Sequence, residues 1–96
     1  MKDQPKMTLH ADGTKEWLLN NKHHRIDGPA IEWPNGSKEW CLSGNRHRTD
    51  GPAVEWADGS KRWYLNGKEV SWRVLYRQAS DPEIELRILI AALTTS

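Results

Sequence analysis

The stretch that decides the fold is GTKEWLLNNKHHRIDGPAIEWPN, residues 13–35, which recurs as GSKEWCLSGNRHRTDGPAVEWAD in residues 36–58. These two copies of one 23-residue phrase are identical at 13 positions. A third copy begins at Gly59 with GSKRWYLNGK, and a partial copy precedes the first, because Met7–His10 aligns with Ala30–Trp33. Self-similarity at a fixed period of about 20 to 50 residues is typical of repeat proteins, whose units complete their cores against their neighbours. Function is therefore expected on a repeating surface.

Size and composition indicate one domain, residues 1–96, near the lower limit for a single hydrophobic core. Hydrophobic residues make up 36% of the chain, with six Trp and no Phe, so burial must depend on a few large rings. The 14 basic and 13 acidic residues nearly balance, which gives no global field that would attract nucleic acid or an anionic membrane. Nucleic acid is thus an unfavoured partner.

The single cysteine, Cys41, can form no internal disulfide and no cysteine pair for a zinc site. The first residues, MKDQPKMT, lack the apolar core of a secretory signal, and the most apolar segment, Ile84–Leu93, is interrupted by Glu85 and Arg87. We expect a cytoplasmic protein with no membrane span and no cofactor.

Turn signals recur at equal spacing along the repeat. Asp12-Gly13, Asn35-Gly36 and Asp58-Gly59 each predict a hairpin, because both residues of such pairs tolerate positive φ. Small polar residues at 20–22, 43–45 and 66–68 predict a second set of turns, followed by short strands over 24–25 and 47–48 and rigid Asp-Gly-Pro corners. The expected fold is mainly β with C-terminal α: an open, twisted antiparallel meander of about six short strands over residues 7–70.

The register of the hairpins decides which side chains share a face. If Asn35-Gly36 is a two-residue loop, Trp33 lies opposite Lys38, and Ile31 lies opposite Trp40. This register also sets Glu32 against Glu39, which is mildly unfavourable, and a bulged loop would shift it. On the two-residue assumption one face carries an aromatic stripe that consists of Trp17, Trp33, Trp40, Trp56 and Trp63.

The repeat ends after Lys68, and the remaining sequence predicts two helices as a cap over residues 71–93. Ser71 can cap a helix over Trp72–Ala79. Ser80-Asp81-Pro82-Glu83 has the form of a capping box with Pro in the first turn, opening a helix to about Leu93. Repeat arrays need such terminal caps, and we expect this one to fold on the tryptophan stripe.

An aromatic residue before an N-G-K turn (Trp63, then Asn66-Gly67-Lys68), a following His and the hairpin period are similar to the MORN repeat, particularly its variant form. The resemblance covers residues 7–70. It implies an elongated single-layer sheet of consecutive hairpins that acts as a scaffold or binding surface. The phrase HRxDGPAxEW also resembles one in small proteins of bacteriophages and their bacterial hosts, which implies a phage or bacterial source and, for a phage protein, the host cytoplasm.

The most distinctive cluster is His24, Arg25 and Asp27, repeated 23 residues later. One interpretation is a pair of Arg/His clusters along one edge, suited to a carboxylate-rich partner or a phosphate. The other is structural: Asp pins its corner and pairs with Arg of the neighbouring unit, which would hold the units in register. The candidate partner-binding residues are His24, Arg25, Arg46, His47, Arg48 and Arg62, and the candidate corner residues are Asp27, Gly28, Pro29, Asp50, Gly51 and Pro52.

Other chemistry finds little support in the sequence. The tryptophans could stack nucleic-acid bases, but core packing is favoured. The histidine spacing matches no metal-ligand pattern, and no nucleophile stands beside a base in a readable motif. We expect neither a metal site nor catalytic residues.

These patterns favour a non-enzymatic protein-binding repeat module. For a phage-encoded chain, a specific form is an inhibitor of a host or defence protein. The alternatives are a nucleotide or nucleic-acid binder that uses the His/Arg clusters and Trp stacking, and a homo-oligomer that forms through the open sheet edges.

Overall fold

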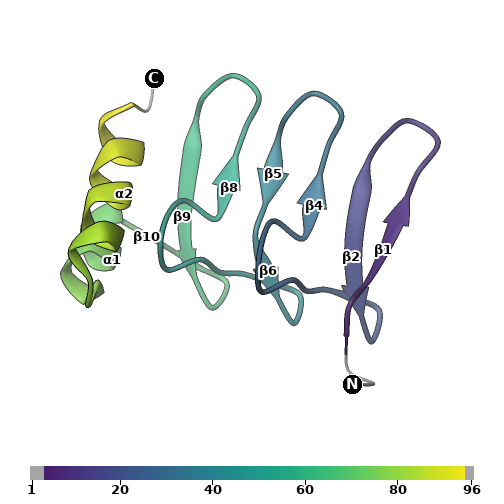
Figure 1. The fold of residues 1–96 in the computed structure, drawn as a ribbon, viewed down its shortest axis with the longest axis horizontal. Coiled ribbons are helices and arrows are strands. Elements are labelled where there is room, and N and C mark those ends of the chain that lie inside the picture. The colour runs from purple at the N-terminus through teal and green to yellow at the C-terminus, as the bar shows by residue number, and fades with distance from the viewer. Residues whose placement is uncertain (1–3, 95–96) are drawn as a thin grey trace.

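A computed structural model describes residues 4–94 as a row of antiparallel hairpins that ends in two helices (Figure 1). The strand order in the open main sheet is β1-β2-β4-β5-β8-β9-β10, with β3 paired to β2, while β6 and β7 form a separate pair. The predicted mainly β fold with two C-terminal helices is confirmed. The strands are β1 (Lys6–Leu9), β2 (Lys15–Leu19), β3 (Lys22–His23), β4 (Ile31–Glu32), β5 (Lys38–Glu39), β6 (Cys41–Leu42), β7 (Asn45–Arg46), β8 (Val54–Glu55), β9 (Lys61–Leu65) and β10 (Lys68–Val70).

The hairpin tips lie where Asp-Gly and Asn-Gly predict them, but each loop has three residues rather than two. In the second hairpin the Trp33 amide donates to the Ser37 carbonyl, and the Gly36 amide donates to the Trp33 carbonyl, both at 3.0 Å. Gly36 has φ +95°, which is typical of a turn that closes with a bulged glycine. The first and third tips have the same bonds.

The extra loop residue shifts the register by one, so the predicted single tryptophan stripe is wrong. Ile31 pairs with Glu39 and Glu32 pairs with Lys38. Because side chains alternate along a strand, the tryptophans divide between the two faces. One face, named the corner face after the Asp-Gly-Pro corners that lie over it, carries Trp17, Trp40 and Trp63. The other, named the ion-pair face, carries Glu16, Ile31, Glu39, Val54 and Arg62, with Trp33 and Trp56 near the hairpin tips. The unfavourable pairing of Glu32 with Glu39 is thereby avoided.

Two-residue turns occur instead at the opposite ends of the hairpins. Asn20 and Asn21 both have positive φ, as do Ser43 and Gly44 in the next unit and Asn66 and Gly67 in the last. Two successive left-handed residues define a type I′ turn, which suits the twist of tightly paired strands. These turns connect β2 to β3, β6 to β7 and β9 to β10.

Each Asp-Gly-Pro segment leaves the sheet as part of a bulge of five residues. Trp17 pairs with residues on both sides of one bulge: the His24 amide donates to its carbonyl at 3.0 Å, and its amide donates to the Ala30 carbonyl at 2.8 Å. Residues 25–29, the first corner, therefore loop out opposite a single residue, and residues 48–52, the second corner, do so opposite Trp40. The predicted strands at 24–25 and 47–48 are thus shifted, because β3 ends at His23 and β7 at Arg46.

Helices α1 (Trp72–Gln78) and α2 (Pro82–Leu93) close the far end of the row (Figure 1). Ser71 caps α1 as predicted, but α2 is capped by Asp81 rather than Ser80, since the Asp81 side chain accepts from the Glu83 amide at 2.8 Å. Both helices pack on the last strands around Trp63, Leu75 and Ile88. Within residues 4–94, no helix is long and apolar enough to cross a membrane.

Candidate functional site: two corners and the groove beside them

The first corner is held together by one arginine. The Arg25 guanidinium lies 3.8 Å from the centroid of the Trp17 ring, within cation–π range. Its Nε donates to Asp27 Oδ1 at 3.0 Å, and its Nη1 donates to the Pro29 carbonyl at 3.1 Å and to Glu32 Oε2 at 3.2 Å. Arg25 thus acts as a clamp that folds residues 25–29 over the ring.

The second corner repeats these contacts. The Arg48 guanidinium lies 3.8 Å from the centroid of the Trp40 ring. Its Nε donates to Asp50 Oδ1 at 2.8 Å, and its Nη1 donates to the Pro52 carbonyl at 3.0 Å and to Glu55 Oε2 at 3.2 Å. The predicted pairing of Asp with an arginine of the neighbouring unit is therefore wrong, because each carboxylate pairs with the arginine of its own corner.

Glycine lets the arginine pass close to the backbone in both corners. A Cβ atom on Gly28 would lie 2.8 Å from Arg25 Cζ, and one on Gly51 would lie 2.7 Å from Arg48 Cζ. Both distances are shorter than van der Waals contact allows, so a larger residue would push the guanidinium off its ring. The Gly of each Asp-Gly-Pro corner is explained by this close approach.

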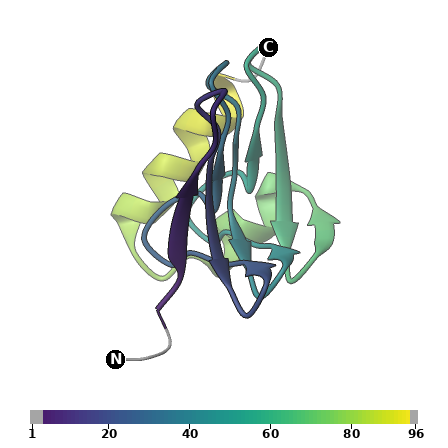
Figure 2. The same cartoon turned by 90° about the vertical axis from the view of Figure 1, so that its right-hand side faces the viewer.

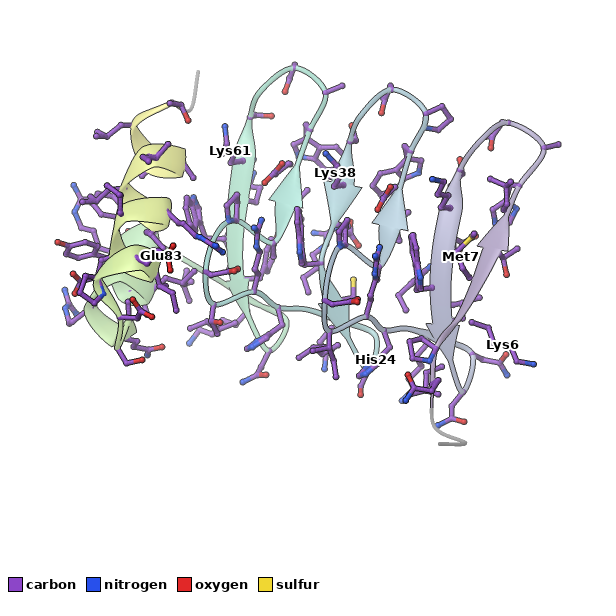
Figure 3. All side chains as sticks on the ribbon, viewed as in Figure 1. Lys6, Met7, His24, Lys38, Lys61 and Glu83 are labelled. Carbon is purple, nitrogen blue, oxygen red and sulfur yellow. The ribbon has the colours of Figure 1, made fainter. Side chains whose placement is uncertain are left out.

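The histidines connect each unit to the next. His24 Nδ1 accepts from the Ser43 amide at 2.9 Å, and His47 Nδ1 accepts from the Asn66 amide at 3.0 Å. In Figure 3, His24 lies part-way along the row, on the lower side that faces away from the hairpin tips. Backbone bonds reinforce the connection, for example from the Arg25 amide to the Cys41 carbonyl at 3.1 Å. The His-Arg edge therefore contributes to the register between repeats.

Arg46 and Arg62, also candidate partner-binding residues, lie on the ion-pair face. Arg46 Nη2 lies 3.1 Å from Glu39 Oε2, and Arg62 Nη1 donates to Glu69 Oε2 at 3.0 Å. The equivalent pair in the first unit joins His23 to Glu16. The six candidate residues are therefore not gathered in one patch: two lie in the corners, two at the connecting turns and two on the opposite face.

The two corners differ in what covers them. In the first, Ile26 is 84% exposed and the Asp27 side chain is 86% exposed. In the second, Thr49 is exposed like Ile26, but the Asp50 side chain is only 35% exposed, and Gly51 and Pro52 are buried. The cover includes α2, since Arg87 Nη1 donates to Asp50 Oδ2 at 3.4 Å. One phrase thus occurs in an open and a covered copy.

A groove of about 650 Å³ runs from the first corner to the second and on to α2. Its floor includes Trp40 and Leu42, and Ile84 and Arg87 of α2 line its far end. Sequence reasoning missed both Ile26 and Arg87. One feature of the sequence could have indicated Ile26: it is an aliphatic residue at the variable position of HRxDG, within a turn that was predicted to be exposed.

The thiol of Cys41 lies on the ion-pair face, where it donates to Glu39 Oε1 at 3.5 Å. Burial, followed by the charge of Glu39, raises the pKa of the Cys41 thiol to about 12, so at neutral pH it is a protonated, poor nucleophile. Among residues 4–94, no group of three or more His, Cys, Asp or Glu side chains is placed to hold a metal ion. The two corners and the groove form a surface on which each arginine is held by hydrogen bonds to the Asp of its own corner.

Comparisons with protein-family models, curated proteins and solved structures give no match to this chain.

Proposed function

We propose that the protein is a non-enzymatic binding module that holds another protein at its first corner and along the adjoining groove. The observation that carries this proposal is the exposure of Ile26, an aliphatic side chain at the apex of a rigid loop, 84% open to solvent. At the second corner the equivalent residue, Thr49, is also exposed but is smaller and polar, and Asp50 beside it meets Arg87 of α2. Ile26 is the most exposed of the large hydrophobic residues that the structure describes, and side chains that fill a pocket near the centre of an interface are typical anchors.

The rigidity of the first corner supports this use. Both ends of the loop pair with Trp17, and Arg25 holds its middle, so the loop keeps one shape before a partner arrives. A preorganised surface loses little conformational entropy on binding, which improves affinity for a given contact area.

A specific form of the proposal is a phage-encoded inhibitor that acts in the host cytoplasm by occupying a surface of a host or defence protein. The rival hypothesis, a nucleotide or nucleic-acid binder, needs arginines and rings on offer to a ligand. Arg25 and Arg48 are engaged with carboxylates, carbonyls and rings of their own corners, which favours the protein partner.

The test exchanges the residues that distinguish the two corners. Tagged wild type, Ile26→Thr and Thr49→Ile are used for quantitative affinity capture from lysate of the cells in which the chain is expressed. We expect a protein retained by wild type and by Thr49→Ile but lost from Ile26→Thr, with all three variants melting alike. Ile26→Thr gives the open corner the residue of the covered one, and Thr49→Ile is its matched control.

Two outcomes would contradict the proposal. Equal recovery by wild type and Ile26→Thr would exclude the first corner as the anchor, and nuclease-sensitive recovery would favour the nucleic-acid binder. Light scattering that shows a dimer, dissociated by Ile26→Thr, would replace the external partner with a second copy of the chain.

A further inference from the structure

We infer, on the basis of the proposed function, that the partner segment at the first corner carries a basic and an aliphatic side chain one helical turn apart. The chain itself displays this pair, because Ile84 and Arg87 of α2 are three residues apart and line the groove beside the second corner. The covered copy thus gives a template for what the open copy binds.

The contact at the second corner uses both oxygens of one carboxylate. Asp50 Oδ1 accepts from Arg48 Nε, while Asp50 Oδ2 accepts from Arg87 Nη1 at 3.4 Å. Ile84 lies close by and lines a small hollow together with Thr49. Viewed along the row from the β1 end, α2 lies on the same side of the sheet as the corner loops (Figure 2).

The first corner has the equivalent carboxylate, held by the same bond from its own arginine. Asp27 Oδ1 accepts from Arg25 Nε at 3.0 Å, so Asp27 Oδ2 corresponds to the oxygen that receives Arg87 in the second corner. Of the charged side chains with ion pairs that line the groove, Asp27 is the most exposed, at 86%. A basic group of a partner would meet this carboxylate first.

The charge balance of the two corners points the same way. Among the described ion pairs, Arg25 alone faces Asp27 and Glu32. At the second corner two arginines, Arg48 and Arg87, face two carboxylates. Glu32 and Glu55 are each paired in register with two lysines of adjacent strands, so the lysines do not change the difference in charge between the corners. The first corner lacks the positive charge that α2 supplies to the second.

The apolar half of the pair follows from the residue that differs between the corners. The covered corner places Thr49 beside Ile84, whereas the open corner presents the larger and more apolar Ile26. Removing this side chain from water needs an aliphatic neighbour. The open corner is therefore better suited than the covered one to an aliphatic guest.

The inference can be tested with α2 itself as the probe. A synthetic peptide of residues 80–94, helix-stabilised by a side-chain staple on its solvent face, is titrated into isotope-labelled full-length protein. We expect NMR shifts at the Ile26 and Asp27 amides and at the Trp40 indole. An Arg87→Glu peptide should bind at least about threefold more weakly, as expected for reversing an exposed ion pair, whereas an Arg87→Lys peptide should bind as the parent does.

Charge exchange provides the decisive control. The protein variant Asp27→Arg should bind the parent peptide at least about threefold more weakly and recover binding to the Arg87→Glu peptide. Shifts that are indifferent to these charges, or that centre on Trp63 because the peptide displaces the protein's own helix, would overturn the inference.

Failure here is separable from failure of the proposed function. If capture depends on Ile26 but the peptide charge has no effect, the binding module remains and the basic partner is excluded. If the peptide behaves as expected but no captured protein depends on Ile26, the corner recognises this chemistry without the proposed role.

Discussion

The first and second corners have the same internal bonds and different surroundings. In each, an arginine lies 3.8 Å from a tryptophan centroid and bonds to an Asp, a Pro carbonyl and a Glu. One corner ends at solvent, whereas the other ends at α2. The comparison shows that the repeated phrase encodes the loop, and that the neighbouring element decides whether the loop is available to a partner.

The same difference explains why a repeat with identical residues need not have identical roles. At the second corner the Asp50 of the clamp also accepts from Arg87 of the helical cap. At the first corner the clamp only shapes an exposed loop. Substitutions at equivalent positions of the two corners should therefore change the free energy of unfolding by different amounts. The difference between the two changes measures how much α2 contributes to the second corner.

The largest inequality is expected for the arginines. Arg48→Ala should lower the free energy of unfolding by about 3 kcal/mol, because it uncovers Trp40 and removes the guanidinium that donates to the buried Pro52 carbonyl and to Glu55. Arg25→Ala should cost about half as much, since water can solvate the exposed Asp27. Chemical denaturation measures both, with the exposed Arg77→Ala as a control that stays within about 0.5 kcal/mol. Equal losses would show that α2 adds nothing to the second corner.

A smaller inequality is expected for the corner glycines. Gly51→Ala should cost about 2 kcal/mol and Gly28→Ala about 1 kcal/mol, because the added methyl group displaces the arginine and only the open loop can shift to accommodate it. In a double-mutant cycle, Gly28→Ala should cost almost nothing once Arg25→Ala has removed the obstacle. If the glycine penalties persist without the arginines, the close approach is not their cause.

The smallest effect concerns the ion-pair face, where His23 of the first unit stands at the position of Arg46. Hydrogen bonding from His23, with a further bond from His10, lowers the pKa of Glu16 below its ordinary 4.5. A carboxylate with a lowered folded-state pKa stabilises the protein above its unfolded pKa, and this stability is lost as pH falls toward the folded value. Thermal melts of Glu16→Gln should show a loss of about 0.5 kcal/mol at pH 6 that vanishes near pH 3.

The control for this titration is Lys68→Gln, an exposed position in β10 that does not change its charge between pH 3 and pH 6. It should leave the pH profile of the wild type unchanged. A Glu16→Gln deficit that is constant between pH 3 and pH 6 would mean that packing rather than charge is lost.

Local chemistry made much of this fold predictable. The period, the hairpin tips, the second turns and the Ser71 cap depend on residues within a few positions of one another, so they can be read from the sequence. The register could not, because Asn35-Gly36 suits both a two-residue loop and a three-residue loop with a left-handed glycine. The difference of one residue between the two loop lengths decides which face of the sheet each tryptophan occupies.

The site was less predictable than the fold. The sequence placed Arg25 and Asp27 in one cluster but offered a pairing of Asp with the neighbouring unit, and the stack of Arg25 on Trp17 depends on a five-residue bulge that no periodicity indicates. The lower exposure of Asp50 compared with Asp27 depends on Arg87 of α2, which lies 37 residues later in the chain than Asp50. Contacts between distant segments are set by the whole packing arrangement, so they became visible only in the structure.

The most direct test of the open and covered corners is carbodiimide labelling of carboxylates, read residue by residue by mass spectrometry. In the free protein, Asp27 should label several-fold faster than Asp50. After addition of the captured partner, Asp27 should slow to about the rate of Asp50, while Asp12 at a distant hairpin tip stays unchanged. Equal rates in the free protein, or protection by the partner that spares Asp27, would contradict the account.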